Sequence, residues 1–476
     1  MHGVEPERGG AAGQRGDAGD GQLPDDIERR VLDEQAVQPQ DGCGASVRPI
    51  TGGAYDGGAT AAARMPVVRM PVSLRGLPRE TYVLALVAFC VALGFGIVVP
   101  AVPLFALQFG VGTTAAGAVV SAFALMRLVS GLAGGRLVDR VGERVALLAG
   151  LGVVAVSSLL AGLAVSYPQL LVLRGVGGIG SAVFTIAATT LLLRVAAAAQ
   201  RGQTQSVYRG GFLLGGIVGP ALGGAVVGVS LRAPFFLYAA TLVLAAVAAA
   251  TLLPRAAGPA PGAAGIVLGV GEDDGLPAAV VEEPPRTSVT TALRSPGYRA
   301  ALAGNFAVGF SVLGVRSTVV PLLVVQDLDL APGWIGVAFT VAALVQAVLL
   351  LPAGKAVDEV GRRPTLVAGG LLSALALLAL AAATGPVSLL LAMTVFAAGA
   401  SLLGVAPAAI VGDVVEGKGG RAVAVWQMSS DLGSVVGPLV AGLLIDRASF
   451  EVALIVSAAV VAACALLGLR MPGQAR

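Results

Sequence analysis

Long apolar runs follow one another through this sequence from residue 81 onward. Each has about 20 residues, the length at which a helix crosses a hydrocarbon core roughly 30 Å thick. A helix is expected in lipid because it satisfies its backbone hydrogen bonds within one segment. The runs predict an all-α membrane protein with twelve spans, near residues 81–106, 113–134, 145–166, 169–193, 206–229, 233–253, 300–324, 332–353, 365–384, 387–411, 422–445 and 450–469.

Composition excludes several other classes of protein. Of 476 residues, 56% are apolar and 12% are charged, about half the charged share of a soluble domain. The 31 basic and 28 acidic residues nearly balance, for a net charge of +3, which argues against a nucleic-acid partner. The single histidine and the distant Cys43, Cys90 and Cys464 offer no metal-ligand spacing and no disulfide framework. We therefore expect no metal, no cofactor and no nucleic acid.

Two polar stretches set the expected domain boundaries. The first 80 residues are polar and Gly-rich without an early apolar core, which is typical of a disordered tail and not of a signal peptide. A true start at Met65 or Met70 is an open alternative. The second stretch is rich in Pro, Gly and acids and is typical of a flexible linker. The expected order is a cytoplasmic tail at 1–80, a six-helix bundle at 81–253, a cytoplasmic linker at 254–298, a six-helix bundle at 299–470 and a tail at 471–476.

Loop charge predicts the orientation. The even-numbered loops and the linker carry most of the basic residues, whereas the opposite loops carry little beyond Arg232 and Arg447. The positive-inside rule therefore predicts that both termini are cytoplasmic. The basic residues concerned are Arg136, Arg140, Arg144, Arg194, Arg201, Arg255, Arg286, Arg294, Arg299, Lys355, Arg362, Arg363, Lys418 and Arg421.

The two predicted bundles are repeats of one another. Asp139 recurs as Asp358 at an offset of 219 residues, and Gly219-Pro220 recurs as Gly437-Pro438 at an offset of 218. Two separate landmarks with nearly the same offset argue against a chance match. Parallel six-helix repeats are a transporter architecture in which the pathway lies between the halves.

Three glycine-containing motifs occur in the predicted first bundle. One is the loop after span 2, from Gly135 to Arg144, which has a weaker copy after span 8 with Gly354 and Gly361 as its glycines; the others are Arg174, Gly178 and Gly180 in span 4 and a run of spaced glycines in span 5. With these motifs the chain resembles the major facilitator superfamily, and within it the drug:proton antiporters with about twelve spans. Gly177 stands where glutamine is usual in the span-4 motif of that family. The resemblance covers roughly residues 80–470 and implies two six-helix bundles that work by alternating access.

For the loop motif, the resemblance implies a cytoplasmic gate. Asp139 would face the start of span 11, where helix amides and Arg421 offer positive charge. A plain turn with a surface ion pair is the alternative. The candidate gate residues are Gly135, Asp139, Arg140, Gly142, Arg144, Asp358, Arg362 and Arg421, and Glu143 departs from the basic residue usual in the family.

Glycines four residues apart lie on one face of span 5, where they allow close helix packing, and a proline is expected to kink the helix. The meaning of this run as an antiporter motif rests on the resemblance alone. Its members are Gly211, Gly215, Gly219, Pro220, Gly223 and Gly224.

Charged residues inside the spans are the main candidates for a role in the mechanism, because a charge at mid-bilayer normally faces a cavity or a partner. Arg127 in span 2 and Asp431 in span 11 lie at nearly the same depth, and in the family fold these spans face each other. We predict an ion pair between the halves. Asp431 is the only carboxylate deep in a predicted span, so it is the candidate proton-coupling acid. The alternatives are a static latch between the two halves without proton binding, and a polar group with only a structural role. Arg174 is a further candidate for proton transfer, or bonds to neighbouring backbone.

Five further residues are candidates for lining the substrate cavity: Asn305, Arg316, Gln346, Trp426 and Gln427. Arg316 either snorkels toward the outer face or, with Arg127 and Arg174, makes the pathway positive enough for an anionic or zwitterionic substrate. Local pairing of each arginine with carbonyl groups is the alternative.

The function that these features favour is proton-driven export of small amphipathic molecules or drugs by a monomer in the cell (inner) membrane. The expected partners are a small-molecule substrate, protons and the lipid bilayer. Uptake of a sugar or organic anion, and a receptor that moves nothing, are the alternatives. An enzyme is not expected, because the spans contain no histidine and no metal cluster.

Overall fold

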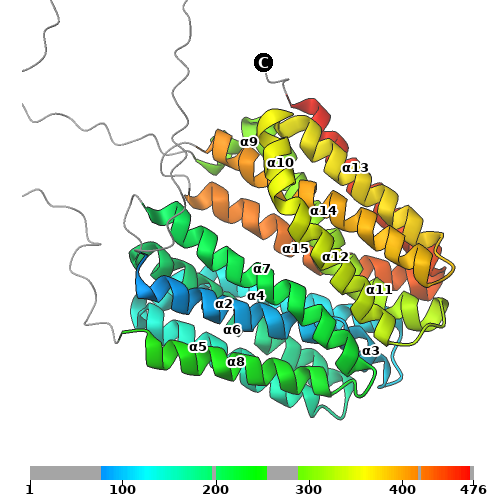
Figure 1. The fold of residues 1–476 in the computed structure, drawn as a ribbon, viewed down its shortest axis with the longest axis horizontal. Helices are drawn as coiled ribbons and strands as arrows, with labels where there is room; N and C mark the ends of the chain where they lie inside the picture. The colour runs from blue at the N-terminus through cyan, green and yellow to red at the C-terminus, as the bar shows by residue number, and fades with distance from the viewer. Residues whose placement is uncertain (1–76, 196–199, 255–287, 416–419, 472–476) are drawn as a thin grey trace, which may run out of the picture. The chain divides into compact units, whose positions relative to one another are not determined.

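Four stretches of the chain are described in a computed structural model: residues 77–195, 200–254, 288–415 and 420–471. They all belong to the unit Pro71–Arg476. Nearly all of the predicted tail 1–80, most of the linker 254–298 and the end of the tail 471–476 lie outside the described residues. Figure 1 shows that the described residues are helical.

The first bundle contains six membrane-length helical segments, of which the first is a broken pair. The breaks and turns fall at Pro100, at glycines and at short polar stretches, as expected for residues that interrupt a helix. The helices are α2 (Arg79–Val98) with α3 (Ala101–Leu107), α4 (Thr113–Val141), α5 (Glu143–Gly162), α6 (Tyr167–Val195), α7 (Arg201–Val227) and α8 (Ala233–Leu252).

The second bundle repeats this order. A short helix, α9 (Val289–Arg294), precedes it, and Ser288 caps α9 by accepting from the Thr291 N–H. The helices are α10 (Pro296–Val308), η3 (Gly309–Val315), α11 (Arg316–Leu322), η4 (Leu323–Asp327), α12 (Gly333–Glu359), α13 (Arg362–Ala381), α14 (Pro386–Val414), α15 (Gly420–Arg447), α16 (Phe450–Leu466) and η5 (Leu467–Arg470).

Twelve segments of the described residues are long and apolar enough to cross a membrane. The prediction of an all-α chain with twelve spans is therefore confirmed. Several boundaries shift: α4 continues to Val141 and α12 to Glu359, beyond the apolar runs that marked them. The ends of both helices carry charged residues, so the helical backbone continues beyond the apolar part of each span.

The seventh span is the least regular. It begins at Pro296, inside the stretch expected to be linker, and two of its segments, η3 and η4, have π-helical hydrogen bonding. A π-helical turn adds a residue to the turn, so it changes the direction in which the following side chains point. The first residue after η3 is Arg316.

The glycine face of span 5 packs on span 1. A Cβ atom on Gly211 would meet the carbonyl oxygen of Ala85, and one on Gly215 would lie 2.7 Å from the Leu93 nitrogen. The repeat preserves this arrangement: a Cβ atom on Gly433 would lie 2.6 Å from the Phe310 nitrogen, so α15 packs on η3 as α7 packs on α2. Helices approach this closely only where a side chain is missing.

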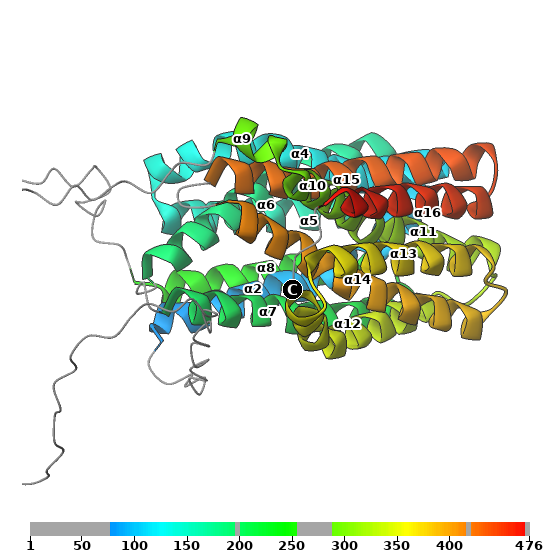
Figure 2. The same cartoon turned by 90° about the horizontal axis from the view of Figure 1, so that it is seen from above.

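Gly224 serves a different contact from the other glycines of its motif. A Cβ atom on it would meet the Cα atom of Gly336 on α12, in the other bundle. The pairs α4–α15, α7–α12 and α3–α11 together join the two bundles. Figure 2 shows α4 beside α15 and α7 beside α12.

We expect Gly215→Ala to destabilise the protein by about 1–3 kcal/mol, because the added methyl group overpacks the α2–α7 contact. The matched control is Gly216→Ala, since a Cβ atom at Gly216 meets nothing within 4 Å. It should be neutral or stabilising by about 0.4–1 kcal/mol. The thermal unfolding midpoint of the purified protein measures both. Equal midpoints for the two variants would contradict the packing.

Candidate functional site

An ion pair joins the two bundles at the middle of the α4–α15 interface. The Nη2 atom of Arg127 on α4 donates to Oδ1 of Asp431 on α15. The side chains are 35% and 17% exposed. Each charge is thus partly withdrawn from solvent, and each helix supplies the partner that the other needs.

Two further contacts extend the α4–α15 interface from this pair. The Ser121 hydroxyl donates to the carbonyl oxygen of Val435 at 2.7 Å. A Cβ atom on Gly117 would meet the carbonyl oxygen of Pro438. The helix backbones therefore lie in close contact along this part of the interface.

The interface ends in a cluster that we call the Asp446 clasp, made by Asp446, Thr113 and Thr114. Asp446 Oδ1 accepts from the Thr113 N–H at 2.8 Å and the Thr113 hydroxyl at 2.6 Å. Its Oδ2 accepts from the Thr114 N–H at 2.8 Å and the Thr114 hydroxyl at 2.6 Å. The carboxylate of one bundle thus caps the first turn of α4 in the other, where N–H groups lack intrahelical partners and the helix dipole favours negative charge.

All these contacts lie between mid-helix and the end of the bundles that carries Asp446. At the opposite end Asp139 and Arg421 are exposed, and no ion pair joins them in the described structure. The expected gate contact is therefore not formed in this conformation. The hydrogen bonds between α4 and α15 lie toward the Asp446 end instead.

The first loop motif is bound to its own bundle. Gly142 has φ +83°, a left-handed conformation that disfavours other residues, and it ends α4 directly before α5. Arg144 donates to the carbonyl oxygen of Ala250 at 2.5 Å. Glu143, the departure from the family motif, forms an ion pair with Arg194 at 3.0 Å.

The second loop motif carries the same ion pair with its charges exchanged. Gly361 has φ +110° in the equivalent turn. Arg362 donates from Nε to Asp413 Oδ2 at 2.8 Å, and its contact with the exposed Asp358 is longer, at 3.7 Å. Arg362 and Asp413 lie 219 residues after Glu143 and Arg194, the offset of the repeat. The Glu143–Arg194 pair therefore occupies the same place in the first bundle as the Arg362–Asp413 pair in the second, and Asp413 is a partner that the sequence analysis missed although the offset points to it.

Arg174 is buried among aromatic side chains of the first bundle. Its side chain is 4% exposed, and its guanidinium carbon lies 4.7 Å from the centre of the Phe123 ring. Phe95 packs against both Phe123 and Tyr238, at ring distances of 6.1 and 6.4 Å. The Nε atom of Arg174 has no hydrogen-bond partner among the described residues.

The expected cavity residues do not converge on one site. Asn305 is 8% exposed and donates to the Trp426 carbonyl at 2.7 Å, so it holds α10 against α15. The Trp426 side chain packs against the apolar core. Gln427 is exposed and Gln346 is half-buried. Arg316 is half-buried, and its guanidinium lies against Phe339 and Phe396.

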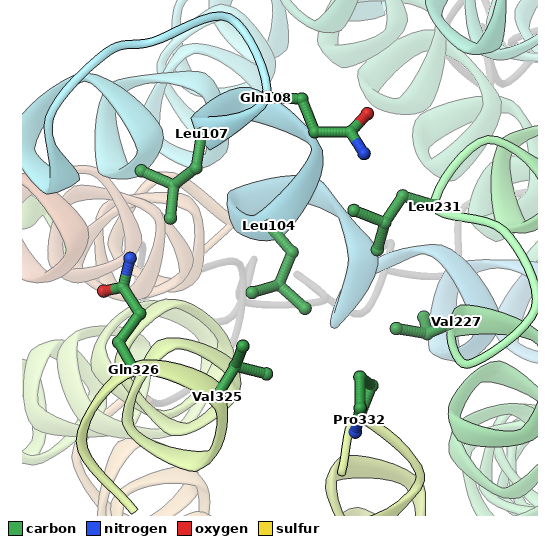
Figure 3. A pocket seen from close by; sticks show the side chains of 8 residues that line it. All are labelled: Leu104, Leu107, Gln108, Val227, Leu231, Val325, Gln326 and Pro332. Atoms are coloured by element: carbon green, nitrogen blue, oxygen red, sulfur yellow. The ribbon is translucent and has the colours of Figure 1, made fainter. Parts of the chain in front are cut away.

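A pocket of about 340 Å³ lies at the Asp446 end of the bundles. Figure 3 shows its apolar walls, with Gln108 and Gln326 as the polar side chains. The pocket is formed by α3, the end of α7 and the loop after it, η4, and the residue before α12. None of the predicted cavity residues lines this pocket. The lining residues are Leu104, Leu107, Gln108, Val227, Leu231, Val325, Gln326 and Pro332.

Comparison with known proteins gives consistent sequence matches. Residues 84–317 and 301–474 match the family model of the Major Facilitator Superfamily. The chain is 24% identical over 359 residues to Multidrug resistance protein 2 of Bacillus subtilis (strain 168), covering 75% of this chain and 86% of the relative. It is 28% identical over 179 residues to Quinolone resistance protein NorA of Staphylococcus aureus (strain MRSA252), covering 37% of this chain and 45% of the relative.

Solved structures agree in fold. The TM-score is 0.67 against a POT family transporter in complex with 5-aminolevulinic acid, at 13% identity, with 83% of this chain and 96% of that chain covered. It is 0.64 against a bacterial homolog to human lysosomal transporter Spinster in an inward-facing and occupied conformation, at 13% identity, with 82% and 95% covered. At these identities the likeness shows the fold alone.

We expect Asp446→Ala to open the α4–α15 interface. The variant loses four hydrogen bonds of about 1 kcal/mol each, so labelling of Ser121→Cys by a water-soluble maleimide should accelerate by roughly tenfold or more. Ser121 is 3% exposed when the clasp is closed. The measurement uses a background in which the three native cysteines are replaced by serine.

The matched control is Arg447→Ala, which removes the neighbouring exposed charge and leaves the clasp intact. Its labelling rate should equal that of the parent. An unchanged rate in Asp446→Ala would show that the clasp does not hold the interface closed.

Proposed function

The chain belongs to the major facilitator superfamily, and we propose that it is a proton-coupled exporter of small amphipathic molecules. The family consists of membrane transporters of small molecules, and this chain is a multi-pass membrane protein and not an enzyme. Two of its relatives are named for multidrug and quinolone resistance. Those names support export of drug-like molecules as the direction and substrate class to test first.

The observation that carries the proposal is the Arg127–Asp431 ion pair between the bundles. Asp431 lies in the middle of α15, and the other acidic residues of the described spans lie near helix ends. A carboxylate in the path between two bundles, paired with an arginine of the opposite bundle, can respond both to a proton and to the relative position of the bundles.

Proton coupling would work through this pair. When Asp431 is ionised, Arg127 stabilises its charge and the pair holds α4 against α15. A proton on Asp431 removes the attraction and leaves Arg127 without its anion. Protonation therefore favours conformations in which the pair is separated, and by linkage those conformations favour protonation. Reciprocity of this kind is what a proton-driven transporter requires.

The basic loops support an orientation in which the Asp446 end faces outward and both termini face the cytoplasm. In that orientation the described conformation is closed outside by the Asp446 clasp and unlatched inside, which is an inward-facing state. The outward-facing state would break the clasp and bring Asp139 near Arg421. The loop motif would thus act as the inner gate, and the protein would work as a monomer in the cell membrane.

Export, uptake and a receptor without transport make different predictions for the same vesicles. In inverted vesicles an exporter fills the lumen with substrate while protons leave it. An uptake system would instead empty a preloaded lumen. Ligand binding without any flux would favour a receptor.

We expect Asp431→Asn to abolish coupled transport while the protein still folds. In inverted vesicles energised to an acidic lumen, addition of a quinolone should release protons from the parent and not from the variant, because Asn cannot carry the proton. The readout is the fluorescence of a pH-sensitive acridine dye, and the thermal unfolding midpoint of the purified variant checks folding.

The control variant is Glu451→Gln, an exposed carboxylate at the start of α16. It should retain proton release. Undiminished release in Asp431→Asn would rule Asp431 out as the coupling acid, and the absence of release in the parent across a panel of drugs and metabolites would overturn proton-coupled export.

A further inference from the structure

Arg316 occupies an unusual position in the second bundle. It is the first residue of α11, directly after the π-helical turn η3. Its guanidinium carbon lies 5.2 Å from the centre of the Phe339 ring on α12 and 5.7 Å from that of the Phe396 ring on α14. Both rings are buried, at 4% and 0% exposure. The cation therefore lies inside the bundle, and π-helical turns are frequently found where a span carries a functional side chain.

No carboxylate of the described residues forms an ion pair with Arg316. The Nε atom of Arg316 is buried without a hydrogen-bond partner in the part of the chain that the structure describes. Arg127, by contrast, has Asp431. Buried polar groups in proteins normally have partners, so the unpartnered Nε–H group of Arg316 needs an explanation.

The aromatic rings limit what that explanation can be. The faces of Phe339 and Phe396 attract the cation but provide no acceptor for its N–H groups. A guanidinium presents a planar fork of donors that matches a carboxylate. Arg316 is half-buried, so an anion that binds it would do so at the exposed part of its side chain. A flat apolar group attached to the anion would then lie beside the rings.

The position of Arg316 also connects it to the proton site. The π-helical turn before it packs on α15, where a Cβ atom on Gly309 would meet the carbonyl oxygen of Ser430, the residue before Asp431. A ligand that shifts α11 and η3 would therefore press on the turn of α15 that carries the acid.

We propose that Arg316, Phe339 and Phe396 form a subsite for the carboxylate of an aromatic acid or zwitterion that the protein transports. The inference rests on the proposed function, since it names the substrate class of the same transporter. Arg316 acts in it as the residue that determines specificity for a negative group.

Binding to the purified full-length protein tests the subsite without a proton gradient. The probes are radiolabelled 2-naphthoate and 2-naphthylmethanol, which share one ring system and differ in charge, and equilibrium dialysis gives the two dissociation constants. The parent should bind naphthoate at least about tenfold more tightly, the ratio expected for a charge-assisted hydrogen bond. In Arg316→Gln that preference should disappear while binding of the alcohol remains.

Two further variants separate recognition from folding. Arg316→Lys keeps the charge without the planar fork and should retain part of the preference. Arg299→Gln removes an exposed arginine at the start of the same span and should retain all of it. Equal affinity of the parent for both probes, binding of neither, or a preference that survives Arg316→Gln would overturn the subsite.

These outcomes are independent of the transport test. Loss of proton-coupled export with an intact preference for naphthoate would overturn the proposed function and leave the subsite standing. Proton release that depends on Asp431, together with no preference for the anion, would overturn the subsite alone.

Discussion

The ion pair between Arg127 and Asp431 joins the two bundles at the middle of the α4–α15 interface. Either charge alone at the middle of a bilayer would cost about 2.5–3.5 kcal/mol on insertion scales. The two bundles share that cost by contributing one charge each, so the pair is satisfied only while α4 and α15 are in contact. The Asp446 clasp then completes the contact at one end. Alternating access would require this interface to exchange its contacts for another set.

Each bundle must hold together while its contacts with the other bundle change. The glycine face of α7 against α2, and its repeat in α15 against η3, provide dense packing within each bundle. The pairs Glu143–Arg194 and Arg362–Asp413 close the two loop motifs onto their own bundles with opposite polarity. Contacts of this type belong to one body and do not oppose movement between bodies.

Periodicity and the repeat offset predict most of the fold. Helix rise places Arg127 and Asp431 at nearly the same depth, whereas the expectation that their spans face each other comes from the resemblance to the family. The sequence did not predict the Asp446 clasp, since half of the partners of Asp446 are backbone N–H groups at a helix start, which no residue type marks. It did not predict the surroundings of Arg316 either. Two π-helical turns in span 7 change the direction of its side chains, and they depend on tertiary packing that local propensity does not encode.

We propose that protonation of Asp431 releases the contacts between α4 and α15 and lets the opposite end of the bundles close. Electron–electron distance measurements between spin labels at Arg136→Cys on α4 and Val423→Cys on α15, both exposed at the end opposite the clasp, test it most directly. Acidification should shift the distance distribution of the parent to shorter values as this end closes, and Asp431→Asn should show the short distances at every pH. Distributions that do not change with pH and do not differ between the two proteins would contradict the account.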